Sequence, residues 1–394
     1  MLLASGLFAA FGQDGAGTRV KNRTLAYTSL SGLIVSFLSS EDVIRFLKCY
    51  CCAFIEEPIL NYRDITKQFQ NPPGFDEDAA HTAQRRQENL TKPHGSLGRL
   101  EELAVWCAGW QGHNPPAADV VQILVFAGNH GVTTRGVSAF PSEVTVQMVA
   151  NFAAGGAAIN QLANQQNADL TVIDLELETP TADFTVEPAM SEEICAAAFT
   201  RGFDAVRLEA DVLIVGEMGI GNTTAAAALS CALYGGEPLD WTGPGTGLDP
   251  AGVAAKARVI ATAIACHGED LGNSFEALRR VGGRELAAIV GAILAARQKR
   301  IPVILDGFVA TASAAVLEHA HPGALDHCVA GHVSEEPGHR RLLECLGKTP
   351  LLDLGMRLGE ASGAAVALSI LRSALVTHNG MATFEEAAVS RETQ

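Results

Sequence analysis

The sequence has few basic residues and no cluster of them. Lysine and arginine together number 28, against 44 aspartates and glutamates, and the formal net charge is -16. Because nucleic-acid phosphates are bound by clustered lysine and arginine, this composition argues against a nucleic-acid partner. Long apolar runs are lacking too, since GLIVSFL, at residues 32–38, is far shorter than the about 20 residues that span a bilayer. We therefore expect neither a nucleic acid nor a membrane as a partner.

Paired cysteine motifs are also lacking. The nine cysteines include a group at Cys49, Cys51 and Cys52, and the others stand singly in apolar contexts. No Cys-x-x-Cys pair has a downstream partner, which argues against a zinc site and favours a reducing compartment. We expect a cytoplasmic protein.

Alanine, glycine and regular apolar segments are abundant. With 48% hydrophobic residues, 6% aromatic residues and 39 glycines, the composition is typical of a compact α/β enzyme. Residues 1–58 differ from the rest and begin without the basic residues of a secretory signal. We interpret them as an N-terminal extension: a targeting segment, an accessory helix pair or residues upstream of the true start. The sequence does not choose among these three.

Five continuous apolar segments are typical of strands buried on both faces of a parallel sheet. They are VVQILVFAG (120–128), DLTVIDL (169–175), ADVLIVGEMG (210–219), IPVILDGF (301–308) and LDHCVAGHV (325–333). Alanine-rich segments of helical length, such as 142–163 and 283–300, lie between them. This alternation predicts an α/β fold with a doubly wound, mostly parallel sheet.

Helical segments flank the alternation at both ends. Residues 81–110 predict two helices broken at Lys92 to Gly95, and residues 339–375 predict two more, broken at Gly347 to Pro350. We expect segments from both ends to pack together as a smaller helical lobe. The predicted domains are the extension at 1–58, the first part of the lobe at 59–115, the α/β catalytic domain at 116–339 and the second part of the lobe at 340–394.

In an open α/β sheet the ligand binds beyond the carboxyl ends of the strands. The predicted strands bring several carboxylates and no basic cluster to that edge. The residues there are Gly128, Asn129 and His130; Asp174; Glu217; Asp306; and His332, Ser334, Glu335, Glu336 and His339. This set predicts a site that stabilises positive charge and moves protons.

The segment GEMGIGNTTAAAAL (216–229) comes within one residue of a nucleotide-binding loop. Gly216, Gly221 and Thr223 have the spacing of G-x-x-x-x-G-K-[ST], but Asn222 replaces the lysine that reaches the β and γ phosphates. Backbone N–H groups and hydroxyls at a helix N-terminus can still hold an anion. The loop therefore predicts a phosphomonoester site, and a glycine-rich turn capped by Thr223 is the plainer alternative.

A second glycine loop follows at residues 241–259. Its turn contains Gly243, Gly245, Thr246 and Gly247, and the helix after it carries Lys256. The two loops and the lysine could enclose one phosphate. An ordinary loop beside a solvated lysine is the alternative.

Long blocks of the sequence resemble one enzyme family. They are, in order, TKPHGSLGRLEELA, FAGNHGVTTRGVSAFPSEVTVQMVANFAAGGAAIN, GEMGIGNTTAAAAL, TGPGTGLD, VILDGFVATASA and SEEPGHRRLLECLGKTPLLDLGMRLGEASGAA. Across roughly residues 63–375 the chain resembles the nicotinate-nucleotide-dimethylbenzimidazole phosphoribosyltransferases, which prepare the lower ligand of cobalamin. Residues 1–58 lie outside the resemblance.

The resemblance implies a reaction that suits these residues. The 5-phosphoribosyl group of nicotinate mononucleotide passes to 5,6-dimethylbenzimidazole, which gives α-ribazole 5′-phosphate and nicotinate with inversion at the anomeric carbon. The pyridinium leaves as a neutral ring nitrogen, the oxocarbenium-like carbon favours nearby carboxylates, and the incoming base needs a general base for its N–H proton. The resemblance also implies a homodimer and neither a metal nor another cofactor. Whether the acceptor is dimethylbenzimidazole or a related base stays open, because a methyl contact changes the binding free energy by only about 1–3 kcal/mol.

The resemblance also implies roles for particular residues. Glu336, directly before Pro337, is the general base. Glu217 is the second catalytic residue, which faces the ribose and either assists Glu336 or replaces it as the base. Glu335 stands where the family often has a small residue, so a base displaced by one position is the alternative. The phosphate-binding candidates are Gly219, Gly221, Asn222, Thr223 and Lys256; the base-pocket candidates are Ser138, Phe140, Gln147 and Met148; and His130, Asp306, Ser334 and His339 are further ligands or supports.

Other interpretations use the same fold. A P-loop ATPase needs the lysine that Asn222 replaces, and an NAD-dependent oxidoreductase needs a good GxGxxG in the first strand-helix unit. A conventional phosphoribosyltransferase using pyrophosphorylated ribose needs paired acidic residues at a strand end, which we do not find. A binding protein without chemistry would not need both Glu217 and Glu336.

Overall fold

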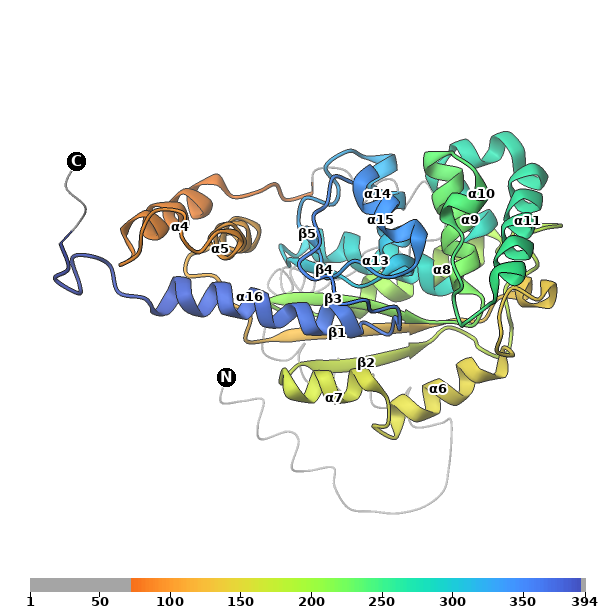
Figure 1. The fold of residues 1–394 in the computed structure, drawn as a ribbon, viewed down its shortest axis with the longest axis horizontal. Helices are drawn as coiled ribbons and strands as arrows, with labels where there is room; N and C mark the ends of the chain where they lie inside the picture. Colours follow the sequence, from red (N-terminus) through yellow and green to blue (C-terminus); the bar gives the residue numbers. More distant parts are fainter. Residues whose placement is uncertain (1–71, 391–394) are drawn as a thin grey trace, which may run out of the picture. The chain divides into compact units, whose positions relative to one another are not determined.

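A computed structural model describes residues 72–390, which contain a five-stranded parallel sheet with helices on both sides (Figure 1). The strands are β1 (Val121–Ala127), β2 (Asp169–Asp174), β3 (Val212–Met218), β4 (Val303–Leu305) and β5 (Cys328–Ala330). Their order is β2-β1-β3-β4-β5, and every neighbouring pair is parallel. All five predicted strands and the doubly wound parallel sheet are confirmed. The expectations for residues 1–58 lie outside the described residues.

Helices connect the strands and extend beyond them at both ends. They are α4 (Glu77–Asn89), α5 (Arg99–Gln111), η2 (Gly131–Arg135), α6 (Glu143–Ala153), α7 (Ala158–Gln165), α8 (Glu192–Ala205), α9 (Asn222–Tyr234), α10 (Pro238–Trp241), α11 (Pro250–His267), η3 (Gly268–Gly272), α12 (Ser274–Val281), α13 (Arg284–Gln298), α14 (Phe308–Ala320), α15 (Pro337–Cys345) and α16 (Ser362–Gly380). None of those within residues 72–390 has both the length and the apolar character that a membrane crossing requires.

The strand side chains alternate between two cores on opposite faces of the sheet. Leu124 and Leu213 join the core beneath α8, α9, α13 and α14, whereas Ile123 and Ile214 join the core beneath α5, α7 and α16. Every residue of β1 is buried. Because helices cover both faces there, β1 is a nearly continuous apolar run. The edge strand β2 differs from the expected strand buried on both faces, because its Asp169, Thr171 and Asp174 are exposed.

The alanine-rich segment 142–163 forms two helices, α6 and α7, in place of one. The interruption contains Gly155, whose φ of 76° lies in the left-handed region that a right-handed helix does not use. The sequence pattern alone did not separate the two helices, because alanines and glycines continue through the break.

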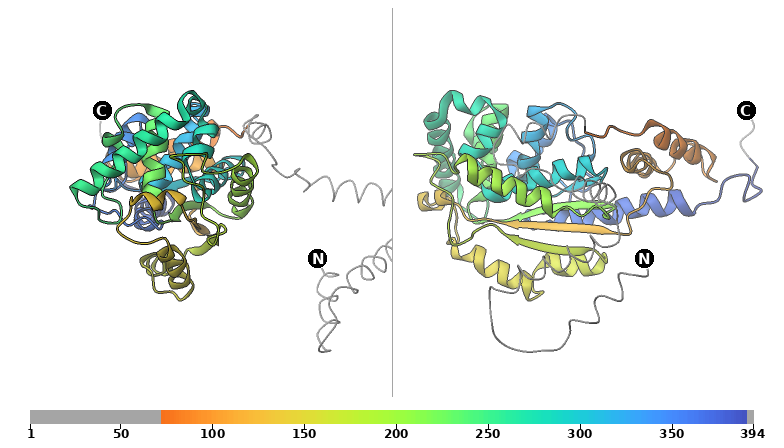
Figure 2. Two further views of the ribbon diagram at one scale, coloured as in Figure 1. Left: turned by 90° about the vertical axis from the view of Figure 1, so that its right-hand side faces the viewer. Right: turned by 180° about the vertical axis from the view of Figure 1, so that it is seen from behind.

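Segments from both ends of the described chain form the helical lobe. Helices α4 and α5 pack against each other, and α5 packs against α16 (Figures 1 and 2). Arg86 of α4 donates hydrogen bonds to the carbonyl groups of His378, Asn379 and Met381 at the end of α16. Helices from both ends therefore pack together, as expected, while the bounds of the lobe stay a prediction. Helix α15, most of which lies in the second part of the predicted lobe, packs instead on α14 and α10.

Candidate active site

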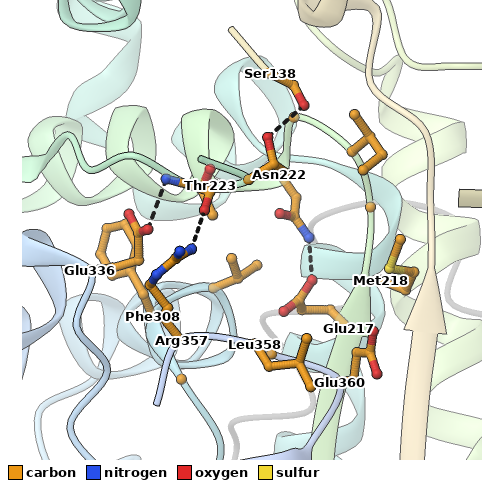
Figure 3. Close-up of a pocket in the computed structure, with 18 of the residues that line it drawn as sticks. Ser138, Glu217, Met218, Asn222, Thr223, Phe308, Glu336, Arg357, Leu358 and Glu360 are labelled. Carbon is orange, nitrogen blue, oxygen red and sulfur yellow. Dashed lines mark hydrogen bonds between the residues drawn. The ribbon is translucent and has the colours of Figure 1, made fainter. Parts of the chain in front are cut away.

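A cavity of about 480 Å³ lies at the carboxyl ends of the strands (Figure 3). The lining comes from the glycine loop after β3, from side chains between Val137 and Met148, from the start of α14, and from Ser334 and Glu336, as the sequence predicts for this edge of the sheet. Residues 245–246 and 357–360 complete the lining. The polar side chains in the lining are those of Ser138, Glu217, Asn222, Thr223, Thr246, Ser334, Glu336, Arg357 and Glu360.

The glycine loop carries the N-terminus of α9 to the cavity. Gly221 precedes the helix with a φ of 96°, which side-chain-bearing residues rarely adopt. A Cβ atom on Gly219 would lie 2.7 Å from the carbonyl oxygen of Gly128, so this position also needs glycine. Thr145 of α6 accepts a hydrogen bond from the Ile220 N–H at 3.1 Å and ties the loop to the neighbouring wall.

Lys256 lies behind this loop and is not part of the cavity lining. Its side chain is buried, and Nζ donates hydrogen bonds to Thr223 Oγ1 at 2.7 Å and to the Gly243 carbonyl oxygen at 3.3 Å. Burial lowers the pKa of Lys256 to about 8, and the charge of Glu336 opposes that shift. The ammonium group is therefore charged at neutral pH, and its contact with Thr223 brings positive charge to the loop.

Glu336 lines the cavity and is only 4% exposed. Its Oε1 accepts a hydrogen bond from the Gly245 N–H at 2.9 Å, while its buried Oε2 has no hydrogen-bond partner among the described residues. Glu335 is exposed and does not line the cavity. Pro337 begins α15 and holds Glu336 in an extended conformation, with φ -66° and ψ 121°. One carboxylate oxygen is thus held by a backbone N–H, and the other is buried beside Gly243 without a hydrogen-bond partner among the described residues.

A hydrogen-bonded chain behind Glu336 fixes its backbone. The Glu336 N–H donates to Ser334 Oγ at 3.3 Å, and the Ser334 N–H donates to His339 Nδ1 at 2.8 Å. Since Nδ1 accepts, the proton of the neutral ring is on Nε2, which donates to Thr311 Oγ1 at 3.0 Å. Burial lowers the pKa of His339 to about 3, so the ring stays neutral. Ser334 lines the cavity, whereas His339 lies outside the lining and supports it.

Glu217 ends β3 and lines the cavity beside the glycine loop. The Asn222 amide donates a hydrogen bond to Glu217 Oε2 (Figure 3). Burial, followed by the charges of Asp306 and Glu285, raises the pKa of Glu217 to about 8, against the Asn222 hydrogen bond. Glu217 therefore carries a proton at neutral pH. Asn222, which stands where a P-loop has lysine, thus donates a hydrogen bond to this carboxyl group instead of contacting a phosphate through a lysine.

Known proteins share this fold and sequence. A family model described as phosphoribosyltransferase matches residues 73–389. The nicotinate-nucleotide-dimethylbenzimidazole phosphoribosyltransferase of Ruegeria sp. (strain TM1040) is 60% identical over 327 residues, which cover 83% of this chain and 97% of that protein. The protein of the same name from Rhizobium meliloti (strain 1021) is 54% identical over 333 residues, covering 84% of this chain and 98% of that one. The crystal structure of such an enzyme from Thermus thermophilus matches with a TM-score of 0.75 and 41% identity, covering 80% of this chain and 100% of that chain.

The chain belongs to the nicotinate-nucleotide-dimethylbenzimidazole phosphoribosyltransferase family. The family resemblance and the enzyme class expected from the sequence are thereby confirmed. The match leaves the first 72 residues outside the family region.

Of the predicted base-pocket residues of this phosphoribosyltransferase, three line the cavity and one does not. Ser138, Phe140 and Met148 line it, and Val144, one helical turn before Met148, joins them. Gln147 is exposed on α6 and lies outside the lining. Phe140 keeps 53% of its surface exposed, so its ring lies at the rim.

Two predicted residues lie behind the lining and support it. His130 is fully buried, and its Nε2 pairs with Glu285 Oε1 beneath the glycine loop. Asp306 accepts a hydrogen bond from the Ala364 N–H at 2.9 Å and so caps α16, not the helix that follows it in the sequence. The His332 ring lies 3.8 Å from Asp306.

The sequence interpretation missed the wall formed by residues 357–360. Arg357 Nη1 donates to the Gly245 carbonyl oxygen at 2.9 Å, and Glu360 is buried in the lining. The expected break between the last two helices begins at Gly347 but continues to Ala361, before α16. The segment RLGE, residues 357–360, could have indicated this wall. It has a charged residue on each side of Leu358 and Gly359, and it lacks helical periodicity.

The second glycine loop holds a carboxylate. A Cβ atom on Gly243 would lie 2.1 Å from Glu336 Oε2, and one on Gly245 would lie 2.8 Å from Thr223 Oγ1 and 3.1 Å from Lys256 Nζ. Glycine at both positions thus lets Glu336, Thr223 and Lys256 approach one backbone segment.

We predict that Glu217→Gln changes the dependence of stability on pH. The folded-state pKa of Glu217, about 8, lies above its ordinary value of 4.5, so the folded protein holds this proton more tightly than the unfolded chain does. The resulting stabilisation is complete below pH 4.5 and is lost as the pH rises through about 8. The variant has no such proton, so its unfolding free energy relative to wild type should rise by roughly 1–4 kcal/mol between pH 5 and 8.

Urea denaturation at several pH values and constant ionic strength measures this difference. Glu335→Gln, which alters an exposed glutamate, is the control and should show no such trend. A difference between Glu217→Gln and wild type that stays constant from pH 5 to 8 would contradict the buried, protonated state of Glu217.

Proposed function

We propose that the protein transfers the 5-phosphoribosyl group of nicotinate mononucleotide to 5,6-dimethylbenzimidazole, giving α-ribazole 5′-phosphate and nicotinate. The observation that carries the proposal is the geometry of Glu336, a buried carboxylate in the cavity wall with one oxygen held by Gly245 and the other without a partner among the described residues. Such a group can accept the N–H proton of a benzimidazole. The family membership of the chain supports the same reaction.

Glu336 is the general base of the proposed reaction. As one benzimidazole nitrogen attacks the anomeric carbon, the N–H proton of the other nitrogen passes to Glu336, and the electrons of the breaking glycosidic bond return to the nicotinate ring nitrogen. Glu217 is protonated at neutral pH and cannot accept a second proton, which favours Glu336 for this role. The exposed Glu335 is outside the cavity, which weighs against the base displaced by one position.

The glycine loop and Lys256 bind the nucleotide phosphate in this proposal. Gly219, Gly221, Asn222 and Thr223 line the cavity at the N-terminus of α9, where backbone N–H groups and the helix dipole favour an anion. Lys256 adds a full positive charge through its contact with Thr223. Ser138, Phe140, Val144 and Met148 offer a largely apolar surface to the aromatic acceptor.

Purified protein incubated with nicotinate mononucleotide and dimethylbenzimidazole tests the reaction. Chromatography should show nicotinate and the riboside phosphate appearing in equal amounts. Nicotinate alone would indicate a hydrolase, and neither product would indicate a binding protein. Competition among benzimidazole, adenine and phenolic acceptors then identifies the preferred base.

Glu336→Gln should lower turnover by about 100-fold or more, because a positioned general base accelerates proton transfer by about 10²–10⁴-fold. Nucleotide binding should change little, since the glutamine amide retains the size of the side chain. The same chromatographic assay and a calorimetric titration with nicotinate mononucleotide measure the two effects. Glu335→Gln is the matched control, and a larger loss of turnover in that variant would move the base by one position.

Lys256→Met should weaken nicotinate mononucleotide binding by roughly 10- to 100-fold, the scale of a hydrogen bond to a charged group. Methionine keeps the buried apolar stem and removes the charge. Because the pKa of Lys256 is about 8, wild-type affinity should also fall as the pH rises above 8, and the variant should lose this dependence. Arg258→Ala removes a positive charge from the exposed face of the same helix and serves as control. Unchanged affinity in Lys256→Met would remove the lysine from the phosphate site.

We also propose that the enzyme is a cytoplasmic homodimer. The family resemblance supports the dimer, and the scattered positions of the cysteines, without a Cys-x-x-Cys framework, support a reducing compartment. Light scattering of the purified protein should give twice the chain mass, and the mass of a single chain would contradict the dimer.

A further inference from the structure

Two buried ionisable groups lie beneath the glycine loop and outside the cavity lining. They are His130, which follows β1, and Glu285, in the first turn of α13, and both side chains are fully buried. His130 Nε2 pairs with Glu285 Oε1, whereas His130 Nδ1 and Glu285 Oε2 have no hydrogen-bond partner among residues 72–390. The proton transfer to Glu336 uses neither group.

Glycines make room for this His130–Glu285 pair. A Cβ atom on Gly283 would lie 2.3 Å from His130 Cε1 and 2.8 Å from Glu285 Oε2, and one on Gly128 would lie 2.4 Å from the same oxygen. A side chain at either glycine would therefore displace the pair. Because both groups are fully buried, bulk water does not screen their charge.

The hydrogen-bond geometry places one negative charge on the pair, at Glu285. The unpaired Nδ1 of His130 favours the neutral ring, because an unpaired N–H of a charged ring costs more free energy than an unpaired lone pair of a neutral one. The Nε2–H then donates to Glu285. The carboxylate is also favoured by its place in the first turn of α13, where the helix dipole stabilises negative charge.

The glycine loop lies between this charge and Glu217 in the cavity wall. A Cβ atom on Gly219 would lie 3.1 Å from Glu285 Oε1 and 3.3 Å from Asn222 Nδ2. The same Asn222 amide donates a hydrogen bond to Glu217 Oε2. Gly219 thus borders both Glu285 and the amide that holds Glu217. Burial, the Asp306 charge and then the Glu285 charge raise the pKa of Glu217 to about 8.

The other charged groups around Glu217 come from separate elements. Asp306 follows β4 and Glu360 precedes α16, and the charges of both oppose ionisation of Glu217. His332, after β5, lies 3.8 Å from Asp306. Since Glu360 lines the cavity and Asp306 caps α16, Glu285 is the acidic group of these three that can be changed without altering either feature.

We propose that His130 and Glu285 are positioning residues that keep a proton on Glu217 and so keep the cavity wall beside the glycine loop neutral. The inference rests on the proposed function, in which that loop binds the phosphate of the nucleotide. An ionised Glu217 would repel this phosphate from within the cavity wall. The Glu285 charge instead lies beneath the loop, where it is paired with His130.

Infrared spectra recorded from pH 5 to 9 measure the proton on Glu217 without a substrate. A protonated carboxyl group has a carbonyl stretching band apart from those of carboxylates, and the band that Glu217→Gln lacks belongs to Glu217. In wild type this band should be present at pH 7 and decline around pH 8. In Glu285→Gln its midpoint should fall by about one pH unit, because a neighbouring negative charge has been removed.

Further variants separate the effect of charge from that of packing. Glu285→Asp keeps the negative charge and should stay closer to the wild-type midpoint than Glu285→Gln does. His130→Leu removes the donor and so favours protonation of Glu285, which should lower the midpoint as well. Glu193→Gln removes an exposed carboxylate from the second position of α8, the position that Glu285 has in α13, and should leave the midpoint unchanged. Thermal unfolding establishes that each variant is folded, and His130→Leu carries the comparison where Glu285→Gln is not.

Calorimetric titration with nicotinate mononucleotide measures the consequence for binding. Glu285→Gln and wild type should bind with nearly equal affinity at pH 6, where Glu217 is protonated in both. At pH 8 the variant should bind about five-fold more weakly, because a smaller fraction of it has a neutral Glu217. A loss of affinity by the same factor at both pH values would indicate a purely structural role and overturn the proposal.

The outcomes separate this inference from the proposed function. A Glu217 band that is absent from wild type at pH 7, or a midpoint that is the same in wild type, Glu285→Gln and His130→Leu, overturns the inference and leaves the reaction intact. A lowered midpoint in both variants, together with a wild type that neither binds nicotinate mononucleotide nor transfers its phosphoribosyl group, supports the control of the proton and overturns the proposed function.

Discussion

Burial of carboxyl groups beside glycine is the constraint on which the rest of the site depends. A carboxylate loses solvation free energy when it leaves water, so it needs both a polar partner and room beside it. The Gly245 N–H supplies a partner for Glu336. Room comes from missing side chains, because Cβ atoms on Gly243 and Gly359 would lie 2.1 Å and 2.6 Å from oxygens of Glu336 and Glu217. The glycines around the cavity therefore leave space for the carboxyl groups, in addition to allowing the turns.

The replacement of the P-loop lysine by asparagine follows from the same constraint. Asn222 occupies the place of the P-loop lysine, and its amide donates to the carboxyl group of Glu217. The positive charge comes instead from α11, where Lys256 reaches Thr223 from behind the loop. One face of the loop can then hold an acidic group while the helix N-terminus stays open to an anion.

Local sequence patterns were sufficient for the fold. Four of the strands are buried along almost their whole length and appear as apolar runs, whereas the edge strand β2 exposes Asp169, Thr171 and Asp174. All five predicted segments nevertheless correspond to strands. The spacing of Gly219 and Gly221 before an alanine-rich segment located the loop, because only glycine fits the left-handed φ and the close approach to Gly128. The Gly155 break between α6 and α7 was not evident, since alanine and glycine on both sides of it carry no boundary signal.

The sequence by itself determined the sheet, the glycine loop and the residue types at the carboxyl edge, because these follow from burial and backbone sterics acting over a few residues. Tertiary structure decided which of those residues face the cavity. Glu335 and Glu336 are chemically identical neighbours, and only the packed turn before α15 buries one and exposes the other. The wall at Glu360 likewise depends on α16 docking against β3 and on the Asp306 cap. These contacts join positions far apart in the chain, and local propensity carries no information about them.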